Sequence, residues 1–226
     1  MPDELLTTLG DKAAPDTAAL VVIDVQNDFV ADEGWGARVG WDPRRNQAAA
    51  KRIARLLPHA RNVRVPIVFV QAIYDEIYLG APMIERNRRR GLDSPRCISG
   101  TWGAEFFLVA PEPGEPVVRK HRYSAFAETE LNTVLRHLGV RSLLLAGVYT
   151  EGCVESTARD AYFLDFYVTL IDDCCATTSQ EIHEGVLERC ERDWGIVTTS
   201  DELIALWGLA PSSPRRSVGR RAGSAT

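Results

Sequence analysis

The sequence predicts an α/β protein built on a doubly wound, mostly parallel sheet with helices on both faces. The first observation is a series of short, continuous apolar runs, which are typical of strands buried on both faces. The second is that segments with a helical spacing of apolar residues separate these runs, as in β–α–β units. The third is the length, because 226 residues suit one large domain with a sizeable core.

The first half of the chain supplies two strands with a helix between them. Residues 19–24 are an apolar run that ends in an acid, and residues 66–70 are the second run. Between them, residues 46–64 repeat apolar positions at helical spacing, with arginines on the opposite face. Residues 71–116 show no clean period and contain many Gly and Pro, so we expect a long functional loop there, a lid or a binding wall.

The second half repeats the pattern. Residues 117–120 form a short strand, and Thr129 is placed to cap a helix that reaches Gly139. The strand at residues 143–146 leads through a glycine-containing turn to Cys153, which opens the next helix. The remaining expected elements are a strand at 166–171, a helix at 180–193, a strand near 196–197 and a short helix at 201–207.

We expect three parts along the chain. Residues 1–17 form a polar, loosely attached lead-in, and residues 18–210 form the folded domain. Residues 211–226 are rich in Ser, Gly and Arg and are expected to be disordered. This tail contains four arginines and no acid, so the formal charge of −5 on the whole chain leaves −9 on residues 1–210.

Composition argues against nucleic acid and a membrane as partners, which leaves the small-molecule substrate that we expect. The acidic body carries no basic stripe with interleaved aromatics, which argues against nucleic acid, and no apolar run is long enough to cross a membrane. The N-terminus lacks the basic start and apolar core of a signal peptide. Five cysteines, an odd number without C-x-x-C spacing, indicate reduced thiols, so we expect a cytoplasmic protein.

Residues 142–157 contain the main candidate for catalysis, Cys153. At the start of a helix, unpaired backbone N–H groups and the helix dipole favour a thiolate and can hold an oxyanion. The alternative is that Cys153 is a small apolar residue packed at the helix start, since free cysteines are mostly buried and inert. Cys174 and Cys175, which follow another strand, are expected to pack rather than react.

Asp24, Lys120 and Cys153 each stand at or just past the carboxyl end of a predicted strand. In a parallel sheet such ends gather along one edge, so distant residues can meet. A carboxylate can take the thiol proton, a lysine can stabilise the resulting anions, and the thiolate can attack a carbonyl carbon. Taken singly, Asp24 could be a strand-end cap and Lys120 a surface residue, but the combination favours catalysis.

Three motifs carry a resemblance to a known family. They are Asp24-Val25-Gln26-Asn27-Asp28-Phe29, then Lys120 followed by Arg122-Tyr123-Ser124-Ala125-Phe126, then Gly147-Val148-Tyr149-Thr150-Glu151-Gly152-Cys153-Val154. In them the chain resembles the isochorismatase-like cysteine hydrolase superfamily. The resemblance is to its amidohydrolase branch, with the ureidoacrylate, biuret and triuret hydrolases and N-carbamoylsarcosine amidase.

The resemblance implies a Rossmann-like fold and a catalytic triad of Asp24, Lys120 and Cys153. It also implies a non-proline cis peptide between Val148 and Tyr149, which turns the Tyr149 N–H toward that of Cys153 to form an oxyanion hole. The implied reaction is hydrolysis of a C–N bond in a small ureide, carbamoyl or amide compound through a thioester-type acyl-enzyme. A homodimer or homotetramer is implied as well.

Two other functions stay open. The true isochorismatases share the Lys-x-Arg-Tyr-Ser-Ala-Phe and Gly-Val-Tyr stretches, and they cleave a vinyl ether without needing a nucleophilic cysteine. The Thr150-Glu151-Gly152-Cys153 sequence here favours the amidohydrolase branch. The second alternative is a catalytically inert member of the superfamily that binds a partner.

No metal or other cofactor is expected. The resemblance implies that members hydrolysing nicotinamide bind a metal through an aspartate and histidines just past the second strand, and this chain has no histidine there. The four histidines (His59, His121, His137, His183) are scattered without ligand spacing.

Polar and aromatic residues near the predicted strand ends are the candidates for substrate binding. A ureide offers N–H donors and carbonyl acceptors, so its pocket should contain hydrogen-bonding groups. The polar candidates are Gln26, Tyr74, Tyr123 and Glu151, and the apolar walls are Phe29, Trp35 and Phe126. Each aromatic residue could instead pack the loop on the sheet. The four arginines of residues 86–90 form a solvated face or attract an anionic substrate.

Overall fold

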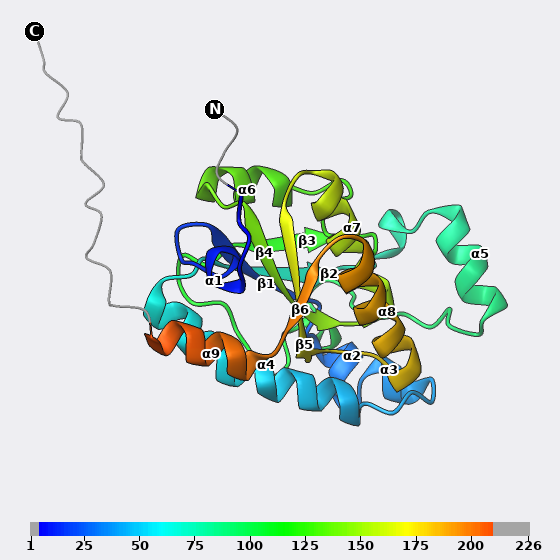
Figure 1. Cartoon of the computed structure of the whole chain (residues 1–226). Helices are drawn as coiled ribbons and strands as arrows, with labels where there is room; N and C mark the ends of the chain where they lie inside the picture. The colour runs from blue at the N-terminus through cyan, green and yellow to red at the C-terminus, as the bar shows by residue number, and fades with distance from the viewer. Residues whose placement is uncertain (1–4, 210–226) are drawn as a thin grey trace, which may run out of the picture.

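Six apolar segments form the strands of one parallel sheet in the computed structural model, which describes residues 5–209 (Figure 1). The strands are β1 (Ala18–Ile23), β2 (Ile67–Ala72), β3 (Val117–Lys120), β4 (Ser142–Val148), β5 (Tyr167–Ala176) and β6 (Ile196–Thr198). Their order across the sheet is β3-β2-β1-β4-β5-β6, with every neighbouring pair parallel. The predicted doubly wound parallel sheet is therefore confirmed.

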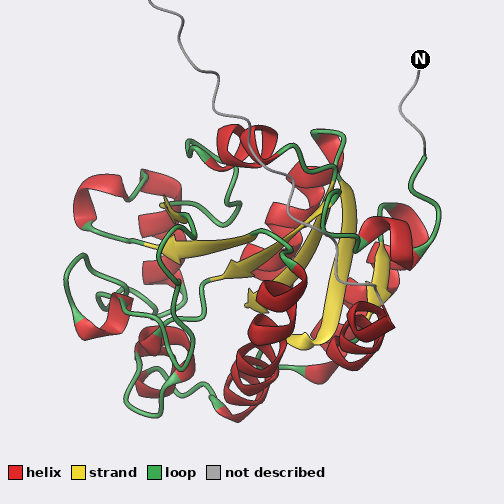
Figure 2. Ribbon diagram, turned by 90° about the vertical axis from the view of Figure 1, so that its left-hand side faces the viewer, coloured by secondary structure: helices red, strands yellow, loops and turns green. Residues whose placement is uncertain are grey.

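Helices cover both faces of the sheet (Figures 1 and 2). The longer ones are α4 (Arg44–Val63), α6 (Leu131–Leu138), α7 (Glu155–Phe163), α8 (Gln180–Asp193) and α9 (Ser200–Leu209). The shorter ones are α1 (Leu9–Lys12), α2 (Asn27–Val30), α3 (Trp35–Arg38), α5 (Ala81–Arg89), the 3₁₀ turns η1 (Glu76–Tyr78) and η2 (Trp102–Ala104), and the π-helical turn η3 (Thr150–Val154).

The side chains of β1 divide the core into two layers. Leu20 and Val22 pack in one apolar cluster with residues of α4 and α9, whereas Val21 and Ile23 pack in another with residues of α6, α7 and α8. This alternation follows from the period of two in a strand. Because both faces are covered, every residue of β1 is buried, which explains the continuous apolar run in the sequence.

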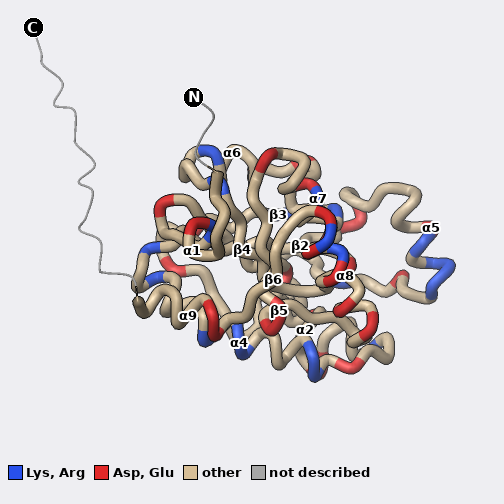
Figure 3. Tube along the Cα trace, viewed as in Figure 1, with Lys and Arg blue, Asp and Glu red and all other residues tan. Residues whose placement is uncertain are grey.

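The region expected to be one long loop contains a helix. Residues 81–89 form α5, which projects from the body of the molecule and carries a row of arginines, as the blue tube in Figure 3 shows. Its helix begins with a proline in the first turn, a position that tolerates the missing N–H. Only Met83 and Ile84 break the polar sequence after that, so no apolar period reveals the helix.

The start of the chain is attached more firmly than expected. Leu6 and Ala13 are buried, and a capping box at Thr8 and Asp11 fixes the short helix α1. The indole N–H of Trp207 in α9 donates to the carbonyl of Ala13 over 2.9 Å. The expected disordered tail, residues 211–226, lies outside the described residues. Within residues 5–209, no helix is both long and apolar enough to span a membrane.

The strand order places a topological switch point between β1 and β4. The chain leaves β1 toward α4 on one face and leaves β4 toward α7 on the other, so the carboxyl ends of these neighbours border an open crevice. Gly147 allows the two strand ends to approach closely: its φ is 139°, and a Cβ there would lie 2.0 Å from the carbonyl oxygen of Ile23. A glycine is therefore required where β4 meets the crevice.

Candidate active site

The structure brings Asp24, Lys120 and Cys153 together at the switch point. The Lys120 ammonium lies 2.7 Å from Oδ2 of Asp24 and donates to Sγ of Cys153 over 3.1 Å. Its third partner is the carbonyl of Arg122, at 2.9 Å. Asp24 and Lys120 are fully buried and Cys153 nearly so, hence the three groups interact with little solvent screening.

Each member of this triad comes from a different strand end. Asp24 follows β1 with a φ of 54°, a left-handed conformation that few residues other than glycine adopt. Its N–H donates to the carbonyl of Val70 in the neighbouring strand, and its own carbonyl accepts from Gln26. Lys120 is the last residue of β3. The local backbone thus fixes both charges before any substrate arrives.

Cys153 lies in the π-helical turn η3, between β4 and α7. Helix α7 begins at Glu155, so the expectation that Cys153 opens an α-helix is corrected by two residues. Such π-turns are frequent at functional sites because they reposition side chains. The peptide between Val148 and Tyr149, just before this turn, is cis. The hydroxyl of Thr157 donates to the Cys153 carbonyl over 2.7 Å and ties the turn to α7.

Burial and charge decide the protonation of the triad. Burial raises the pKa of the Cys153 thiol to about 12, the nearby Asp24 carboxylate adds to this, and Lys120 opposes it. Burial also raises the pKa of Asp24, against the attraction of Lys120. Burial lowers the pKa of Lys120, but the charges of Asp24 and Cys153 outweigh this and leave it well above its usual value.

These shifts correct the expectation that the helix start favours a thiolate at rest. Burial favours the neutral thiol most, and repulsion by the Asp24 carboxylate adds to this, while the attraction of Lys120 for a thiolate offsets only part of the rise in the pKa. Asp24 is the carboxylate in a position to take the thiol proton when the sulfur reacts. A reaction at Cys153 would therefore need a base, and Asp24 is the carboxylate that interacts with its thiol.

All five cysteines are free and buried, and they differ in their surroundings. Cys174 and Cys175 lie within β5 and pack in the core, as expected. Burial raises the pKa of Cys97, Cys174, Cys175 and Cys190 above its ordinary value. Of the five, Cys153 is the one that both contacts a lysine and lines a cavity.

A cavity of about 280 Å³ opens beside Cys153. This volume suits a small molecule rather than a polymer. The cavity is lined by residues from the helices α2, α3, α5 and α8, from η3 and from the loops between the elements: Phe29, Trp35, Trp41, Tyr74, Arg86, Arg90, Arg96, Tyr123, Tyr149, Glu151, Gly152, Cys153, Thr177, Thr178 and Ile182. The sequence had pointed to Phe29, Trp35, Tyr74, Tyr123 and Glu151 as substrate-binding residues.

Two expected substrate-binding residues lie elsewhere. Gln26 is fully buried, and its amide group donates to the carbonyls of Ala72 and Ala104 and accepts from the Ala72 N–H. It therefore joins the end of β1 to β2 and η2, and it has no free group for a ligand. Phe126 is partly buried and packs against the core residue Phe166, with ring centroids 6.1 Å apart.

Sequence reasoning missed Trp41, Arg96, Thr177, Thr178 and Ile182 as lining residues. Ile182 comes from α8, which was predicted, but the face it presents to the cavity depends on how that helix packs. Arg96 lies in an irregular loop, where no spacing rule applies. The arginines of residues 86–90 were noted in the sequence, and two of them line the cavity, Arg86 of α5 and Arg90 directly after that helix.

Aromatic rings form one wall of the cavity. Trp41 makes edge-to-face contacts with Trp35 and Tyr149, with centroids 5.1 and 5.2 Å apart, and Phe29 contacts Tyr149 at 5.6 Å. Buried Asp28 holds this wall in place, because its carboxylate accepts from the backbone N–H of Trp35 over 3.0 Å and from that of Cys97 over 2.6 Å. The wall is therefore fixed by packing and hydrogen bonds in advance.

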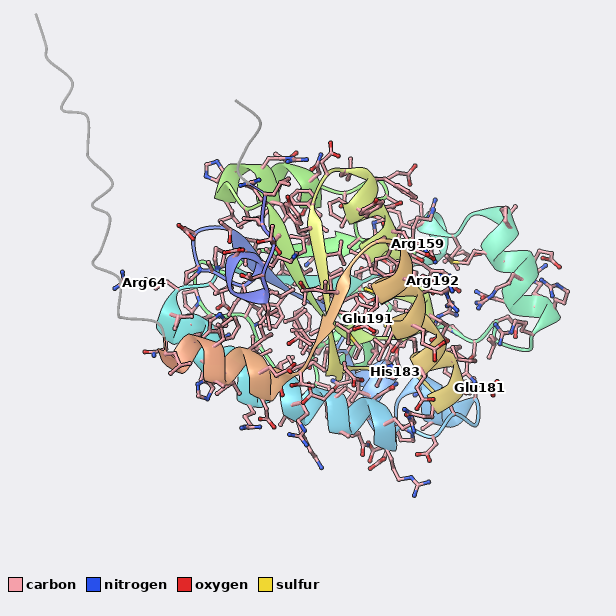
Figure 4. All side chains as sticks on the ribbon, viewed as in Figure 1. Arg64, Arg159, Glu181, His183, Glu191 and Arg192 are labelled. Carbon is pink, nitrogen blue, oxygen red and sulfur yellow. The ribbon has the colours of Figure 1, made fainter. Side chains whose placement is uncertain are left out.

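The two histidines nearest the site have structural partners. His121 Nδ1 is 2.7 Å from the carbonyl oxygen of Ile73, and its ring stacks on Tyr78. His183, labelled on α8 in Figure 4, bridges the hydroxyl of Thr150 in η3 and the carboxylate of Asp172 in β5, at 2.9 and 2.8 Å. Within residues 5–209, no three His, Cys, Asp or Glu side chains are grouped so that they could hold a metal ion.

Comparison with known proteins identifies the family. A family model described as the isochorismatase domain matches residues 18–202, which is most of the chain. The chain belongs to the isochorismatase family. Within it, a similar relative is the ureidoacrylate amidohydrolase RutB of Methylorubrum extorquens, which is 33% identical over 199 residues that cover 81% of this chain and 79% of that protein.

Solved structures of the isochorismatase family share the fold. An isochorismatase family protein from Desulfovibrio vulgaris superposes with a TM-score of 0.74 at 29% identity, covering 85% of this chain and 98% of that one. The N-carbamoylsarcosine amidase of Thermoplasma acidophilum superposes with a TM-score of 0.66 at 24% identity, covering 82% and 97%. The second likeness shows the fold alone.

Proposed function

We propose that this protein is a metal-independent cysteine hydrolase that cleaves a C–N bond of a small ureide or carbamoyl compound. Membership of the isochorismatase family, with relatives named as amidohydrolases, makes it a hydrolase of C–N bonds. The observation that carries the cysteine mechanism is the contact of Lys120 with both Asp24 and Cys153, where Cys153 lines the cavity.

In the first half of the reaction, the sulfur of Cys153 attacks the carbonyl carbon of the substrate. Asp24 accepts the thiol proton as the C–S bond forms, since the thiol is neutral at rest. Asp24 then gives this proton to the departing nitrogen as the C–N bond breaks. For a monosubstituted ureide, ammonia leaves and a thiocarbamate remains on Cys153.

The carbonyl oxygen becomes negative during the attack and needs hydrogen-bond donors. The backbone N–H groups of Tyr149 and Cys153 are the donors that we assign to this oxyanion. The cis peptide between Val148 and Tyr149 and the π-turn set the directions of these two groups. The proximity of Lys120 to the sulfur further stabilises the negative charge.

In the second half, a water molecule attacks the thiocarbamate carbonyl. Asp24 takes a proton from this water, the C–S bond breaks, and the sulfur recovers a proton from Asp24. The released carbamate or related acid leaves Cys153 as a thiol. One carboxylate thus carries a proton in both halves, and Lys120 keeps it close to the sulfur.

The experiment that tests this function is a screen of ammonia release by the purified protein. We expect turnover of monosubstituted ureas or carbamoyl amino acids, and kcat/KM lower by orders of magnitude for an aliphatic amide of equal size, because buried polar groups would then lack partners. Cleavage of isochorismate without ammonia release from any ureide would contradict the assignment.

Metal independence is tested on the same active preparation. The roles of nucleophile, base and cation are all filled by Cys153, Asp24 and Lys120 in the proposed mechanism. Dialysis against a strong chelator should therefore leave ammonia release unchanged. Loss of activity to the chelator, followed by recovery on adding zinc, iron or manganese, would overturn this part of the proposal.

A further inference from the structure

The cavity beside Cys153 has an excess of positive charge. Arg86, Arg90 and Arg96 line it, and Glu151 is the one carboxylate among the described lining residues. The adjacent Asp24–Lys120 pair adds no net charge, because its ionised members balance. A small cavity with low-dielectric walls and an excess of one sign attracts a ligand of the other sign.

Arg96 is the most deeply placed of these arginines. Arg96 is 8% exposed. Its guanidinium lies over the rings of Trp35 and Tyr74, 4.6 and 5.0 Å from their centroids. Its hydrogen bond within the protein goes from Nη1 to the carbonyl of Leu92, over 3.2 Å. No Asp or Glu of residues 5–209 forms an ion pair with it.

A buried guanidinium without a carboxylate partner is costly unless something else compensates its charge. The two aromatic faces compensate part of it through cation–π contacts, and they also hold the plane of the group. Most of the five N–H donors of Arg96 remain for a ligand. The backbone of the next residue is held in place, because the Cys97 N–H donates to the buried carboxylate of Asp28. This hydrogen bond fixes the position of Arg96.

Tyr74 connects this arginine with the catalytic triad. Burial raises the pKa of the Tyr74 hydroxyl well above its usual value, and the hydroxyl interacts with the charges of Lys120, Cys153 and Asp24 on one side and Arg96 on the other. Tyr74 also lines the cavity together with Cys153 and Arg96. One small ligand can therefore reach both the sulfur and the guanidinium.

We propose that Arg96 binds a carboxylate of the substrate, which makes the substrate class a ureido acid rather than a neutral ureide. This inference rests on the proposed function, and it assigns each end of the substrate to a part of the cavity. The ureide carbonyl lies at Cys153, where Glu151 can accept its N–H groups. The carboxylate lies at Arg96 and accepts two parallel N–H bonds. Arg86 of α5 and Arg90, the C-cap of that helix, add positive charge.

Calorimetry on the Cys153→Ala protein tests the inference without turnover. The two probes are 3-ureidopropionate and its uncharged isostere isopentylurea. Charge-assisted hydrogen bonds should make the first bind about 10- to 100-fold more tightly. Adding Arg96→Gln should abolish this preference while leaving the affinity for isopentylurea unchanged. Adding Arg89→Gln instead, on an exposed arginine paired with Glu85, should preserve it.

Equal binding of the two probes, no binding of the carboxylate, or an unchanged preference in the Arg96→Gln protein would each overturn the inference. If Arg96→Gln does not fold, a protein that combines Arg86→Gln and Arg90→Gln is measured in its place. Its affinity for 3-ureidopropionate must then be lower by at least about threefold. Ammonia release by the unmodified enzyme is measured separately. Its absence with every ureide contradicts the proposed function, whereas calorimetry alone decides the role of Arg96.

Discussion

Lys120 is the residue on which the charges of the catalytic site depend. Its ammonium contacts Asp24 and Cys153, the proposed base and nucleophile, and Lys120 and Asp24 are fully buried. Burial raises the pKa of Asp24, and the Lys120 ammonium beside it counteracts part of this rise by stabilising the carboxylate. The same contact offsets the negative charge that moves from carboxylate to sulfur during attack.

The pH dependence of kcat/KM follows from these shifts. Asp24 must be a carboxylate to accept the thiol proton, and its pKa is raised above the ordinary value of 3.8. Activity should therefore be full above that raised pKa and fall as the pH is lowered through it, so the acid limb lies above pH 3.8. Lys120 has a pKa well above 10.5 and should cause no loss below that pH.

Initial rates of ammonia release, measured across the pH range at low substrate concentration, check this profile. A matched profile of the Asp24→Glu protein controls for the identity of the base. An acid limb at or below pH 3.8 would contradict the role given to buried Asp24, and a loss assigned to Lys120 near neutral pH would contradict its pairing.

Removing Lys120 should cost stability as well as activity. Lys120→Met leaves the Asp24 carboxylate buried without a cation, which should lower the free energy of unfolding by about 3–5 kcal/mol at neutral pH. The double variant Asp24→Asn/Lys120→Met removes both charges and should recover much of that loss. Urea unfolding of the wild-type, single and double variants gives the coupling energy, and strictly additive losses would refute the pairing.

At the scale of elements, the end of β4 is the part that positions the site. β4 approaches β1 so closely at Gly147 that no side chain fits, and it then enters the cis peptide and the π-turn that carries Cys153. Asp172 of β5 and His183 of α8 support that turn through Thr150. Three neighbouring elements thus hold one short loop.

Gly147→Ala should be strongly destabilising. The new Cβ would lie 2.0 Å from a backbone oxygen of β1, and the φ of 139° is one that alanine rarely adopts. Gly208→Ala in α9 is the matched control, since open space surrounds that position and alanine favours helix by up to about 1 kcal/mol. Thermal unfolding should show a clear loss for the first change and none for the second. Equal melting temperatures would contradict the close approach.

The sequence predicted elements well where one period dominated. The continuous apolar runs gave the positions of the strands, and the helix expected at residues 180–193 begins and ends as predicted. Thr129 lies one residue before the N-cap of α6, although its hydroxyl does accept from the Leu131 N–H. Helix α5 was missed because its arginine-rich surface buries little, so no apolar stripe marks it.

At the scale of the whole molecule, the cavity was only partly predictable. Asp24, Lys120 and Cys153 could be placed together because parallel strands end at one edge of the sheet. Gln26 was wrongly expected to bind the substrate. Its position two residues after Asp24 in the sequence gives no sign that its side-chain amide forms hydrogen bonds with three backbone groups. Arg96 could not be found, because its stacking on two rings joins segments far apart in the chain.

The assembly state also belongs to this scale, and the homodimer or homotetramer stays a prediction. Sedimentation of the purified protein at several concentrations measures it directly. A mass that remains that of one chain at micromolar concentration would contradict the expectation.

The central claim is that Cys153 attacks the substrate. The most direct test is the rate of ammonia release by the Cys153→Ala protein, beside a Cys190→Ala control that removes a buried thiol from α8. We predict that Cys153→Ala lowers kcat by about a thousandfold or more with an unchanged melting profile, and that Cys190→Ala retains most activity. A folded Cys153→Ala protein with kcat within about tenfold of wild type would contradict the account.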